Sequence, residues 1–196
     1  MITLTKEYWE GRYAENQTGW DVGSISEPLK NYIDQLENKH LRVLIPGAGN
    51  AYEMEYLWNQ GFTNAFVLDI AATPLENLQK RNPSIPKNHL IQTDFFQWNE
   101  TYDLILEQTF FCALHPNLRA AYAQKMASML RPNGKLVGLF FDTDFGNDFP
   151  PFGENKEEYL SYFTPYFDIL TFEKCRNSIA PRVGKELFFI FQKKQN

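Results

Sequence analysis

Glycine and carboxylate residues in the first half of the chain have the spacing of a nucleotide-binding site. Gly47 and Gly49 follow the apolar run 43–45, and Asp69 comes twenty residues after Gly49, at the end of a second apolar run, 66–68. Two glycines allow a tight turn with positive φ and a close backbone approach to a ligand. A carboxylate at the tip of the neighbouring strand can accept hydrogen bonds from both hydroxyls of a ribose. The spacing favours a ligand site over glycines used for backbone reasons alone.

The start of the next predicted helix counts against a ligand that carries phosphates. A dinucleotide fingerprint needs a third small residue, at the position that Tyr52 holds here. Glu53 and Glu55 suit the helix dipole in the first turns, but they would repel a phosphate on the helix N-terminus. No Gly-Lys-Ser or Gly-Lys-Thr follows the glycines, which excludes a P-loop. These residues fit a nucleoside cofactor without phosphates, and S-adenosylmethionine is the obvious candidate.

Two further candidate positions follow predicted strands, at the sheet edge where open α/β sheets bind ligands. Asp94 and Phe95 come after a strand over 89–92; the carboxylate can accept a hydrogen bond from an adenine amino group, and the ring can contact the base. In the alternative, Asp94 caps a turn beside a core phenylalanine. Gln108 follows the strand over 102–107, next to the glycine turn in a doubly wound sheet. We therefore expect Gln108 to face the reacting end of the cofactor.

Alternating strands and helices must position these residues. Hydrophobic patterns predict strands over 41–46, 63–69, 89–92, 102–107, 134–142, 167–173 and 185–193, and helices over 51–60, 73–81, 116–130 and 157–163. This alternation implies a parallel sheet covered on both faces. Tyr52, Tyr56 and Leu57 are expected on one face of the first of these helices. Thr73 is the expected cap of the second, and residues 131–134 are expected to turn from the third helix into the next strand.

Aromatic residues mark the N-terminal segment, residues 1–40. Trp9 and Tyr13 are four residues apart and share a face if this segment is helical, and Trp20 follows in a turn. The rings either anchor an N-terminal arm or form a lid over the cofactor, because both roles need aromatic area. Loop 143–154 contains three Phe with Gly and Pro, and we expect it to pack at the active face.

Composition limits the remaining possibilities. The 196 residues are expected to form one domain, with a lid segment over 1–40 and an α/β core over 41–196. A net charge of −5 argues against a nucleic acid partner. The N-terminus lacks the apolar core of a signal peptide and no segment could span a membrane, so we expect a cytoplasmic protein. Cys112, Cys175 and the three histidines show no ligand spacing, so no metal is expected. We expect a monomer, since no long apolar stripe is left unassigned.

An ordered set of short motifs over nearly the whole chain resembles the thiopurine methyltransferase-like family of S-adenosylmethionine-dependent enzymes. The motifs are, in order, Trp9-Glu10-x-x-Tyr13, Trp20-Asp21, Val43-Leu44-Ile45-Pro46-Gly47-Ala48-Gly49, Leu68-Asp69-Ile70, Asp94-Phe95-Phe96, Pro150-Pro151-Phe152 and Ile179-Ala180-Pro181-Arg182-x-Gly184-Lys185. Within the family, residues 110–116 and Pro181-Arg182 look more like the plant halide and thiol methyltransferases. Animal thiopurine enzymes generally carry an arginine where this chain has Gln108, a departure that counts against thiopurine turnover.

The resemblance implies a fold, a cofactor and a set of site residues. The fold is the Rossmann-like class I methyltransferase fold, an α/β architecture whose seven-stranded, mostly parallel sheet ends in an antiparallel strand and carries helices on both faces and an N-terminal aromatic lid. The cofactor is S-adenosylmethionine, and the product is S-adenosylhomocysteine. The residues assigned to the cofactor by resemblance are Trp9, Tyr13 and Trp20 as its cover, Gly47 and Gly49 beneath its amino-acid part, Asp69 and Ile70 at the ribose, Asp94 and Phe95 at the adenine, and Gln108 near the methionine portion.

The expected reaction moves a methyl group to a small soft nucleophile: a thiol or thiopurine sulfur, thiocyanate or a halide ion. Displacement at a sulfonium methyl requires alignment and desolvation, and a thiolate or halide needs little general-base help. We expect Arg182, with Gln108, to attract or orient an anionic acceptor; in the alternative, Arg182 is a surface residue in a hairpin-like connection. The rival functions are a nicotinamide-dependent oxidoreductase, which Tyr52 counts against, and a non-catalytic cofactor-binding module, which the Phe-rich loop 143–154 counts against.

Overall fold

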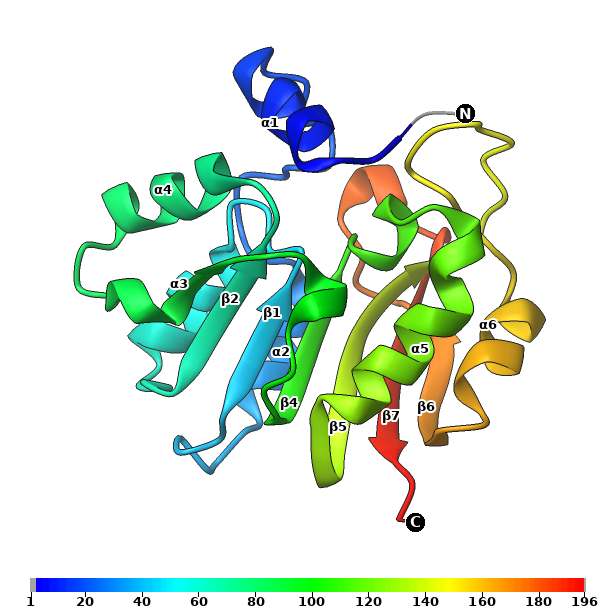
Figure 1. Ribbon diagram of the computed structural model, residues 1–196. Coiled ribbons are helices and arrows are strands. Elements are labelled where there is room, and N and C mark those ends of the chain that lie inside the picture. The colour runs from blue at the N-terminus through cyan, green and yellow to red at the C-terminus, as the bar shows by residue number, and fades with distance from the viewer. Residues whose placement is uncertain (1–2, 196) are drawn as a thin grey trace.

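The computed structural model describes residues 3–195, and its strands form one mixed sheet (Figure 1). The strands are β1 (Val43–Pro46), β2 (Ala65–Asp69), β3 (Leu90–Gln92), β4 (Tyr102–Gln108), β5 (Leu130–Phe141), β6 (Phe167–Lys174) and β7 (Glu186–Lys193). Their order across the sheet is β3-β2-β1-β4-β5-β7-β6. Strands β1 to β5 pair in parallel, while β7 pairs antiparallel with β5 and β6. The seven-stranded, mostly parallel sheet with an antiparallel last strand is therefore confirmed.

Helices cover both faces of this sheet. They are α1 (Lys6–Ala14), α2 (Glu27–Asp34), α3 (Tyr52–Asn59), α4 (Ala72–Arg81), α5 (Arg119–Ser128) and α6 (Lys156–Phe163). One core cluster joins α2, α3 and α4 to the sheet, and the other joins α5 and α6 to its opposite face. Helix α1 belongs to neither cluster and lies above the carboxyl ends of the strands (Figure 1). The two packed faces leave that edge of the sheet as the place for a site.

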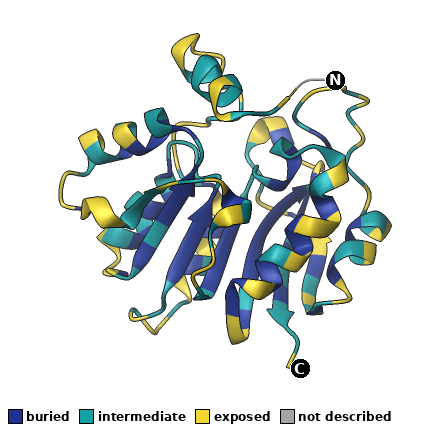
Figure 2. Ribbon diagram, viewed as in Figure 1, coloured by how far each residue is buried: buried dark blue, intermediate teal, exposed yellow. Residues whose placement is uncertain are grey.

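Strand alternation explains how one sheet supports two cores. Within β1, Val43 and Ile45 pack toward α2, α3 and α4, while Leu44 packs toward α5 and α6. All four residues of β1 are buried, and Figure 2 shows that most of the central part of the sheet is buried. The α5–α6 side is rich in aromatic rings: Phe140 stacks on Tyr159 with 4.6 Å between ring centroids. Much of the high aromatic content therefore belongs to the core.

The prediction of a turn at residues 131–134 was wrong. Strand β5 begins at Leu130, and helix α5 ends at Ser128, so the strand starts before the Pro-Asn-Gly sequence. Asn133 has φ of +62°, and the pairing jumps from Tyr102 with Leu130 to Leu104 with Lys135. The segment is a bulge within β5, because the backbone resumes its pairing with β4 beyond it.

The predicted helix cap at Thr73 was also wrong. Helix α4 begins at Ala72, and the Thr73 hydroxyl donates a hydrogen bond to Glu10 Oε2 of α1 at 2.5 Å. Glu10 Oε1 also accepts a hydrogen bond from Ala72 N at 2.5 Å. A carboxylate from a different helix thus satisfies the free amide groups at the start of α4. This contact ties α1 to the segment that follows β2.

Tyr52, Tyr56 and Leu57, which were expected on one face of α3, differ in burial. Leu57 is buried, but the other buried residues of the helix are Glu53 and Met54. Tyr52 and Tyr56 lie at the side, where their hydroxyls donate hydrogen bonds to Asp21 and Asp34. The two tyrosine hydroxyls have hydrogen-bond acceptors at the side of the helix, and the carboxylate of Glu53 lies on the buried side.

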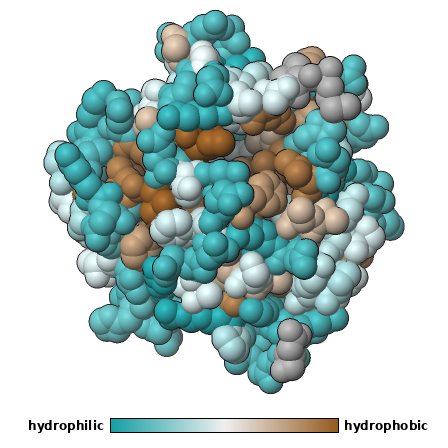
Figure 3. All heavy atoms as spheres, in the orientation of Figure 1, coloured by the Kyte–Doolittle hydropathy of each residue, from teal (hydrophilic) through white to brown (hydrophobic). Residues whose placement is uncertain are grey.

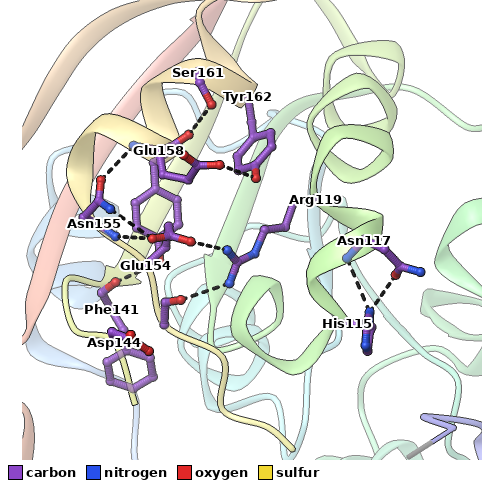
Figure 4. A network of polar contacts seen from close by, with 12 residues as sticks. His115, Asn117, Arg119, Phe141, Asp144, Glu154, Asn155, Glu158, Ser161 and Tyr162 are labelled. Atoms are coloured by element: carbon purple, nitrogen blue, oxygen red, sulfur yellow. Dashed lines mark hydrogen bonds and ion pairs between the residues drawn. The ribbon is translucent and has the colours of Figure 1, made fainter. Parts of the chain in front are cut away.

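Loop 143–154 is anchored to α5 at its end, as Figure 4 shows. Arg119 donates hydrogen bonds to Glu154 Oε2 at 2.5 Å and to the Gly153 carbonyl at 3.0 Å. Phe152 is buried, and its amide donates to the Cys112 carbonyl at 2.7 Å. The loop is held in place beside β4 and β5. Over residues 3–195, the structure has no helix with the length and apolar character needed to cross a bilayer.

Candidate functional site

A cavity of about 590 Å³ opens at the carboxyl edge of the sheet, beneath α1. Figure 3 shows apolar atoms gathered around this hollow. All the predicted site residues line it: Trp9, Tyr13, Trp20, Gly47, Gly49, Asp69, Ile70, Asp94, Phe95, Gln108 and Arg182. Residues from the N-terminal segment, four strand ends and the segment before β7 therefore meet in one space. Among residues 3–195, no group of His, Cys, Asp or Glu side chains could hold a metal ion.

The glycine turn after β1 has the conformation that its sequence predicts. Gly47 and Gly49 have φ of +58° and +54°, values that side-chain-bearing residues rarely adopt. A Cβ added to Gly47 would lie 2.2 Å from the Phe110 ring, so this glycine is needed for packing as well as for its φ. A Cβ on Gly49 would meet Tyr13 Oη at 3.6 Å and Trp20 Nε1 at 3.7 Å. The turn therefore lies directly under the lid aromatics.

Asp69 closes the other side of this turn. Its Oδ2 accepts a hydrogen bond from Gly49 N at 3.2 Å, and its Oδ1 accepts one from Ala71 N at 2.9 Å. The residue is 8% exposed, and burial raises the pKa of its carboxyl to about 6, although the backbone N–H donors act in the opposite direction. A carboxylate at a strand tip beside a glycine turn is the arrangement that accepts ribose hydroxyls.

The N-terminal segment forms an aromatic layer over the cavity. Trp20 contacts Trp9 and Tyr13 edge-on, with ring centroids 5.6 Å and 5.7 Å apart. Asp21 fixes the next turn, because it accepts hydrogen bonds from Asn50 Nδ2 and from Tyr52 Oη. The segment is anchored on the core, as the first interpretation expects, and its rings line the cavity, where the second would place a lid.

Asp94 and Phe95 combine the ligand-site position with the structural alternative. Asp94 is exposed and caps a short 3₁₀ helix by accepting a hydrogen bond from Phe96 N at 2.9 Å. Phe95 is buried and packs against Phe110 and Tyr122. Both residues still line the cavity, so core packing does not remove them from the site.

Gln108 ends β4 and Arg182 precedes β7, whereas Asp94 follows β3, on the other side of β1 in the sheet order. Gln108 Oε1 accepts a hydrogen bond from the Ser26 hydroxyl at 2.8 Å. Arg182 is 9% exposed, which excludes the alternative of a surface arginine. Its Nη2 donates to the Trp20 carbonyl at 3.0 Å, and its Nη1 lies 3.4 Å from Glu186 Oε1. The guanidinium thus links the lid to β7.

Known proteins agree with this architecture. The family profile described as thiopurine S-methyltransferase matches residues 4–194. The chain belongs to this family. It is 29% identical over 184 residues to a probable thiol methyltransferase 2 of Arabidopsis thaliana, covering 91% of this chain and 81% of the relative. It is 30% identical over 192 residues to thiocyanate methyltransferase 1 of Brassica oleracea, covering 94% and 84%.

Solved structures show the same fold. The Burkholderia thailandensis 1,6-didemethyltoxoflavin-N1-methyltransferase, solved with S-adenosylhomocysteine, superposes with a TM-score of 0.77 at 16% identity, covering 97% of this chain and 87% of that one. At this identity the likeness supports the class I methyltransferase fold. Family membership makes the chain an S-adenosylmethionine-dependent methyltransferase, in place of the nicotinamide alternative.

The family's cofactor fits the residues that line the cavity. A sulfonium cation suits aromatic walls and carboxylates, and the lid rings together with Asp21 and Asp69 supply both. The helix after the glycine turn offers Tyr52 and Glu53 where a phosphate ligand would need small or basic residues. The cavity is therefore chemically suited to a nucleoside with a positive charge and without phosphates.

Sequence analysis missed two buried carboxylates near this site. Glu53 is 6% exposed and lines the cavity, whereas Glu107 is fully buried beneath it. One sequence feature could have located Glu53: it shares the inward face of α3 with Met54 and Leu57, at i+1 and i+4. Glu107 has no such feature, because it follows the apolar run 104–106 directly, next to the last residue of β4.

Proposed function

We propose that this methyltransferase moves the methyl group of S-adenosylmethionine to a small, soft sulfur nucleophile, of the thiol or thiocyanate type. The observation that carries the proposal is the single cavity that unites the glycine turn, Asp69, the aromatic lid and an apolar acceptor end. That end is bounded by Leu114, Leu118, Phe141 and Pro151. Two relatives are a probable thiol methyltransferase and a thiocyanate methyltransferase, which supports this acceptor class.

The proposed binding roles follow the geometry. Asp69 and Ile70 hold the ribose, Asp94 and Phe95 the adenine, and Gly47 with Gly49 the amino-acid part. Trp9, Tyr13 and Trp20 cover the bound cofactor and exclude water. When bound, the cofactor supplies a methyl group on a positively charged sulfur, which leaves as a neutral thioether.

The proposed acceptor end holds Gln108 and Arg182. Gln108 can offer its amide N–H to the acceptor, since its Oε1 is already bonded to Ser26. Arg182 positions the lid through the Trp20 carbonyl and presents a positive charge beside the Phe141 ring. Alignment of the acceptor and removal of water are the contributions that these residues make to the reaction rate.

The same proposal treats the chain as one functional unit. Residues 1–40 act as the lid of the core over 41–196, because the lid rings complete the cavity wall. The small cavity and the net charge of −5 favour a small-molecule acceptor over nucleic acid. We propose a cytoplasmic monomer, since the residues of a single chain line the whole cavity.

The proposal is tested by calorimetric titration with S-adenosylhomocysteine, with NAD as the control. Asp69→Ala should weaken S-adenosylhomocysteine binding at least tenfold, because ribose hydroxyls lose a carboxylate partner. Glu76→Ala, which changes a carboxylate on α4 that does not line the cavity, should leave it unchanged. Methylation of thiols and thiocyanate is then measured directly. Binding of NAD alone, or binding without turnover of any sulfur acceptor, would refute the proposed function.

A further inference from the structure

Glu53 is a buried carboxylate that faces the cavity from the first turn of α3. It is 6% exposed, and it lines the cavity together with Ser26, Gln108 and Arg182. Within residues 3–195, no side chain donates a hydrogen bond to it. The backbone N–H groups of Ser26 and of Glu53 itself act on the carboxylate, but they offset only part of the effect of burial, because its pKa remains raised. A carboxylate buried at a cavity wall with amide donors alone calls for a functional explanation.

The groups around Glu53 come from each element packed against it. Asp21 approaches from the lid, Ser26 from the segment before α2, and Arg182 from the segment before β7. Ser26 contributes its backbone N–H, which acts against the effect of burial. Arg182 is a cation that favours the charged form of Glu53, but its guanidinium also pairs with Glu186, which is 3% exposed. The surroundings therefore leave Glu53 accessible to the cavity and incompletely neutralised.

These neighbours place Glu53 at the acceptor end. The Ser26 hydroxyl bonds to Gln108 at the tip of β4, and the Arg182 guanidinium lies 5.5 Å from the centroid of the Phe141 ring at the tip of β5. Asp69, proposed for the ribose, ends β2, and Asp94, proposed for the adenine, follows β3, both on the other side of β1. The neighbours of Glu53 therefore lie away from the positions proposed for the nucleoside.

We propose that Glu53 is the general base of this enzyme, that it takes the proton of a neutral thiol acceptor, and that its charge makes the site favour protonated thiols over thiocyanate and halide anions. This inference rests on the methyl transfer proposed above and names the acceptor more closely. A base with a pKa near neutrality is effective at physiological pH, and burial raises the pKa of the Glu53 carboxyl to about 7.

The charge of the whole cavity agrees with this choice. Its acidic lining residues are Asp21, Glu53, Asp69 and Asp94, and its basic ones are Arg12 and Arg182. Four carboxylates against two guanidinium groups leave a formal charge of −2 when all are ionised. A negative cavity attracts a cationic cofactor and repels an anionic acceptor, whereas a neutral thiol pays no such electrostatic penalty on entry.

The proposed step balances in atoms and charge. The thiol proton moves to a carboxylate oxygen of Glu53 as the thiol sulfur forms its bond to the methyl carbon. The bond between that carbon and the sulfonium sulfur breaks, and its electron pair stays on the departing sulfur. The products are a methyl thioether, S-adenosylhomocysteine and protonated Glu53, which then releases its proton to water.

The test compares wild type with Glu53→Gln, using 2-mercaptoethanol, potassium thiocyanate and potassium iodide as acceptors between pH 5.5 and 8.5. Wild-type kcat/KM for the thiol should rise with pH and level off near pH 7. For thiocyanate and iodide it should fall over the same range, because ionised Glu53 repels anions. Glu53→Gln should lower thiol kcat/KM about 100-fold at pH 7.5, a loss typical of a general base. For the anions it should remove the pH dependence and raise kcat/KM at pH 8.5.

Two controls separate this inference from the proposed function. Glu55→Gln changes a neighbouring carboxylate that pairs with Arg81 outside the cavity, and it should leave all three profiles unchanged. S-adenosylhomocysteine affinity, measured by calorimetry, should change less than about twofold in Glu53→Gln. If affinity falls as much as thiol turnover, Glu53 holds the cofactor, and the inference is overturned.

The remaining outcomes are equally decisive. If Glu53→Gln methylates the thiol within a few-fold of wild type, the base assignment fails while the methyltransferase proposal stands. If wild type prefers the anions throughout the pH range, the acceptor selectivity fails. If wild type binds S-adenosylhomocysteine but methylates none of the three acceptors, the proposed function fails, and this inference fails with it.

Discussion

Two regions of the molecule each bury a glutamate, and they treat it differently. Beneath the cavity, Glu107 accepts hydrogen bonds from Phe110 N at 2.7 Å, from Phe111 N at 3.1 Å and from the Tyr122 hydroxyl. At the cavity wall, Glu53 has no side-chain donor among the described residues and borders open space. Burial is the largest cause of the raised pKa in both cases, and both values lie at about 7.

The difference shows that a raised pKa does not by itself identify a functional carboxyl group. Glu107 organises the tight turn after β4, because two consecutive amides and a phenol converge on it. Glu53 has only backbone N–H groups, its own and that of Ser26, acting on its carboxylate, and it borders the cavity, where we propose that it accepts a proton. Hydrogen-bond donors and access to the cavity are the properties that distinguish a carboxyl group with a structural role from one that can take part in the reaction.

The largest expected effect is on folding. At pH 6, Glu107→Ala should lower the free energy of unfolding by about 4 kcal/mol, because two amides and one hydroxyl lose a buried acceptor and each costs about 1–3 kcal/mol. Glu53→Ala should change it by less than about 1 kcal/mol, since few donors depend on it. Urea unfolding followed by circular dichroism measures both values. If both variants lost the same free energy of unfolding, the distinction between a structural Glu107 and a non-structural Glu53 would be wrong.

The outline of the fold was predictable from sequence, because it depends on local patterns. The alternation of apolar runs with helical periodicity predicted the parallel sheet, and the spacing from Gly49 to Asp69 predicted which strand tips meet. These features need only the period of the pattern and the general rule that ligands bind at carboxyl ends. The structure accordingly brought all the predicted site residues into one cavity.

The errors concern contacts that link distant parts of the chain. Thr73 has the sequence of a cap, but its hydroxyl is used by Glu10, 63 residues away. Glu53 was expected to suit the dipole of α3 and to repel a phosphate, and its burial was not foreseen, because the groups around it come from the lid and from the segment before β7. For Arg182 the sequence left two interpretations open, an acceptor-site residue or a surface residue, and only the contact with the Trp20 carbonyl, 162 residues away, accounts for its burial. Local propensity carries no information on such partners.

A second prediction concerns the pH dependence of stability, in which Glu53 and Glu107 should behave alike. Each carboxyl has an ordinary pKa of 4.5 and a folded-state pKa of about 7, so the folded protein retains protons that the unfolded chain releases. Stability should therefore fall as pH rises from 5 to 8, by about 3 kcal/mol for each group at 1.36 kcal/mol per pKa unit.

Glu107→Gln and Glu53→Gln should each remove a similar share of this pH dependence, although only the second changes acceptor selectivity. Urea unfolding at closely spaced pH values provides the measurement. A slope that survives both substitutions would show that these carboxyls are not the source of the effect.

The smallest effect is expected for Glu10, a carboxylate that is hydrogen-bonded but less deeply buried than Glu53 and Glu107. Burial would raise the pKa of Glu10, but hydrogen bonds from Thr73 and from the Ala72 and Thr73 amides outweigh it, and the pKa is lowered. The docked lid therefore favours ionised Glu10. The contribution of Glu10 to stability is present above its ordinary pKa of 4.5 and is lost as pH falls. Its pH dependence is therefore opposite in sign to that of Glu53 and Glu107.

Glu10→Gln should change global stability by less than about 1 kcal/mol, because the contact is partly open to water. It should weaken S-adenosylhomocysteine binding a few-fold at pH 7.5, since α1 is then held less firmly over the cavity. Glu7→Gln on the exposed face of α1 is the matched control and should leave affinity unchanged. Calorimetry at pH 7.5 and pH 5 tests the sign, because the gap between wild type and Glu10→Gln should narrow at the lower pH. A gap that widens there would mean that Glu10 holds the lid as a neutral acid, which would contradict the lowered pKa of its carboxyl.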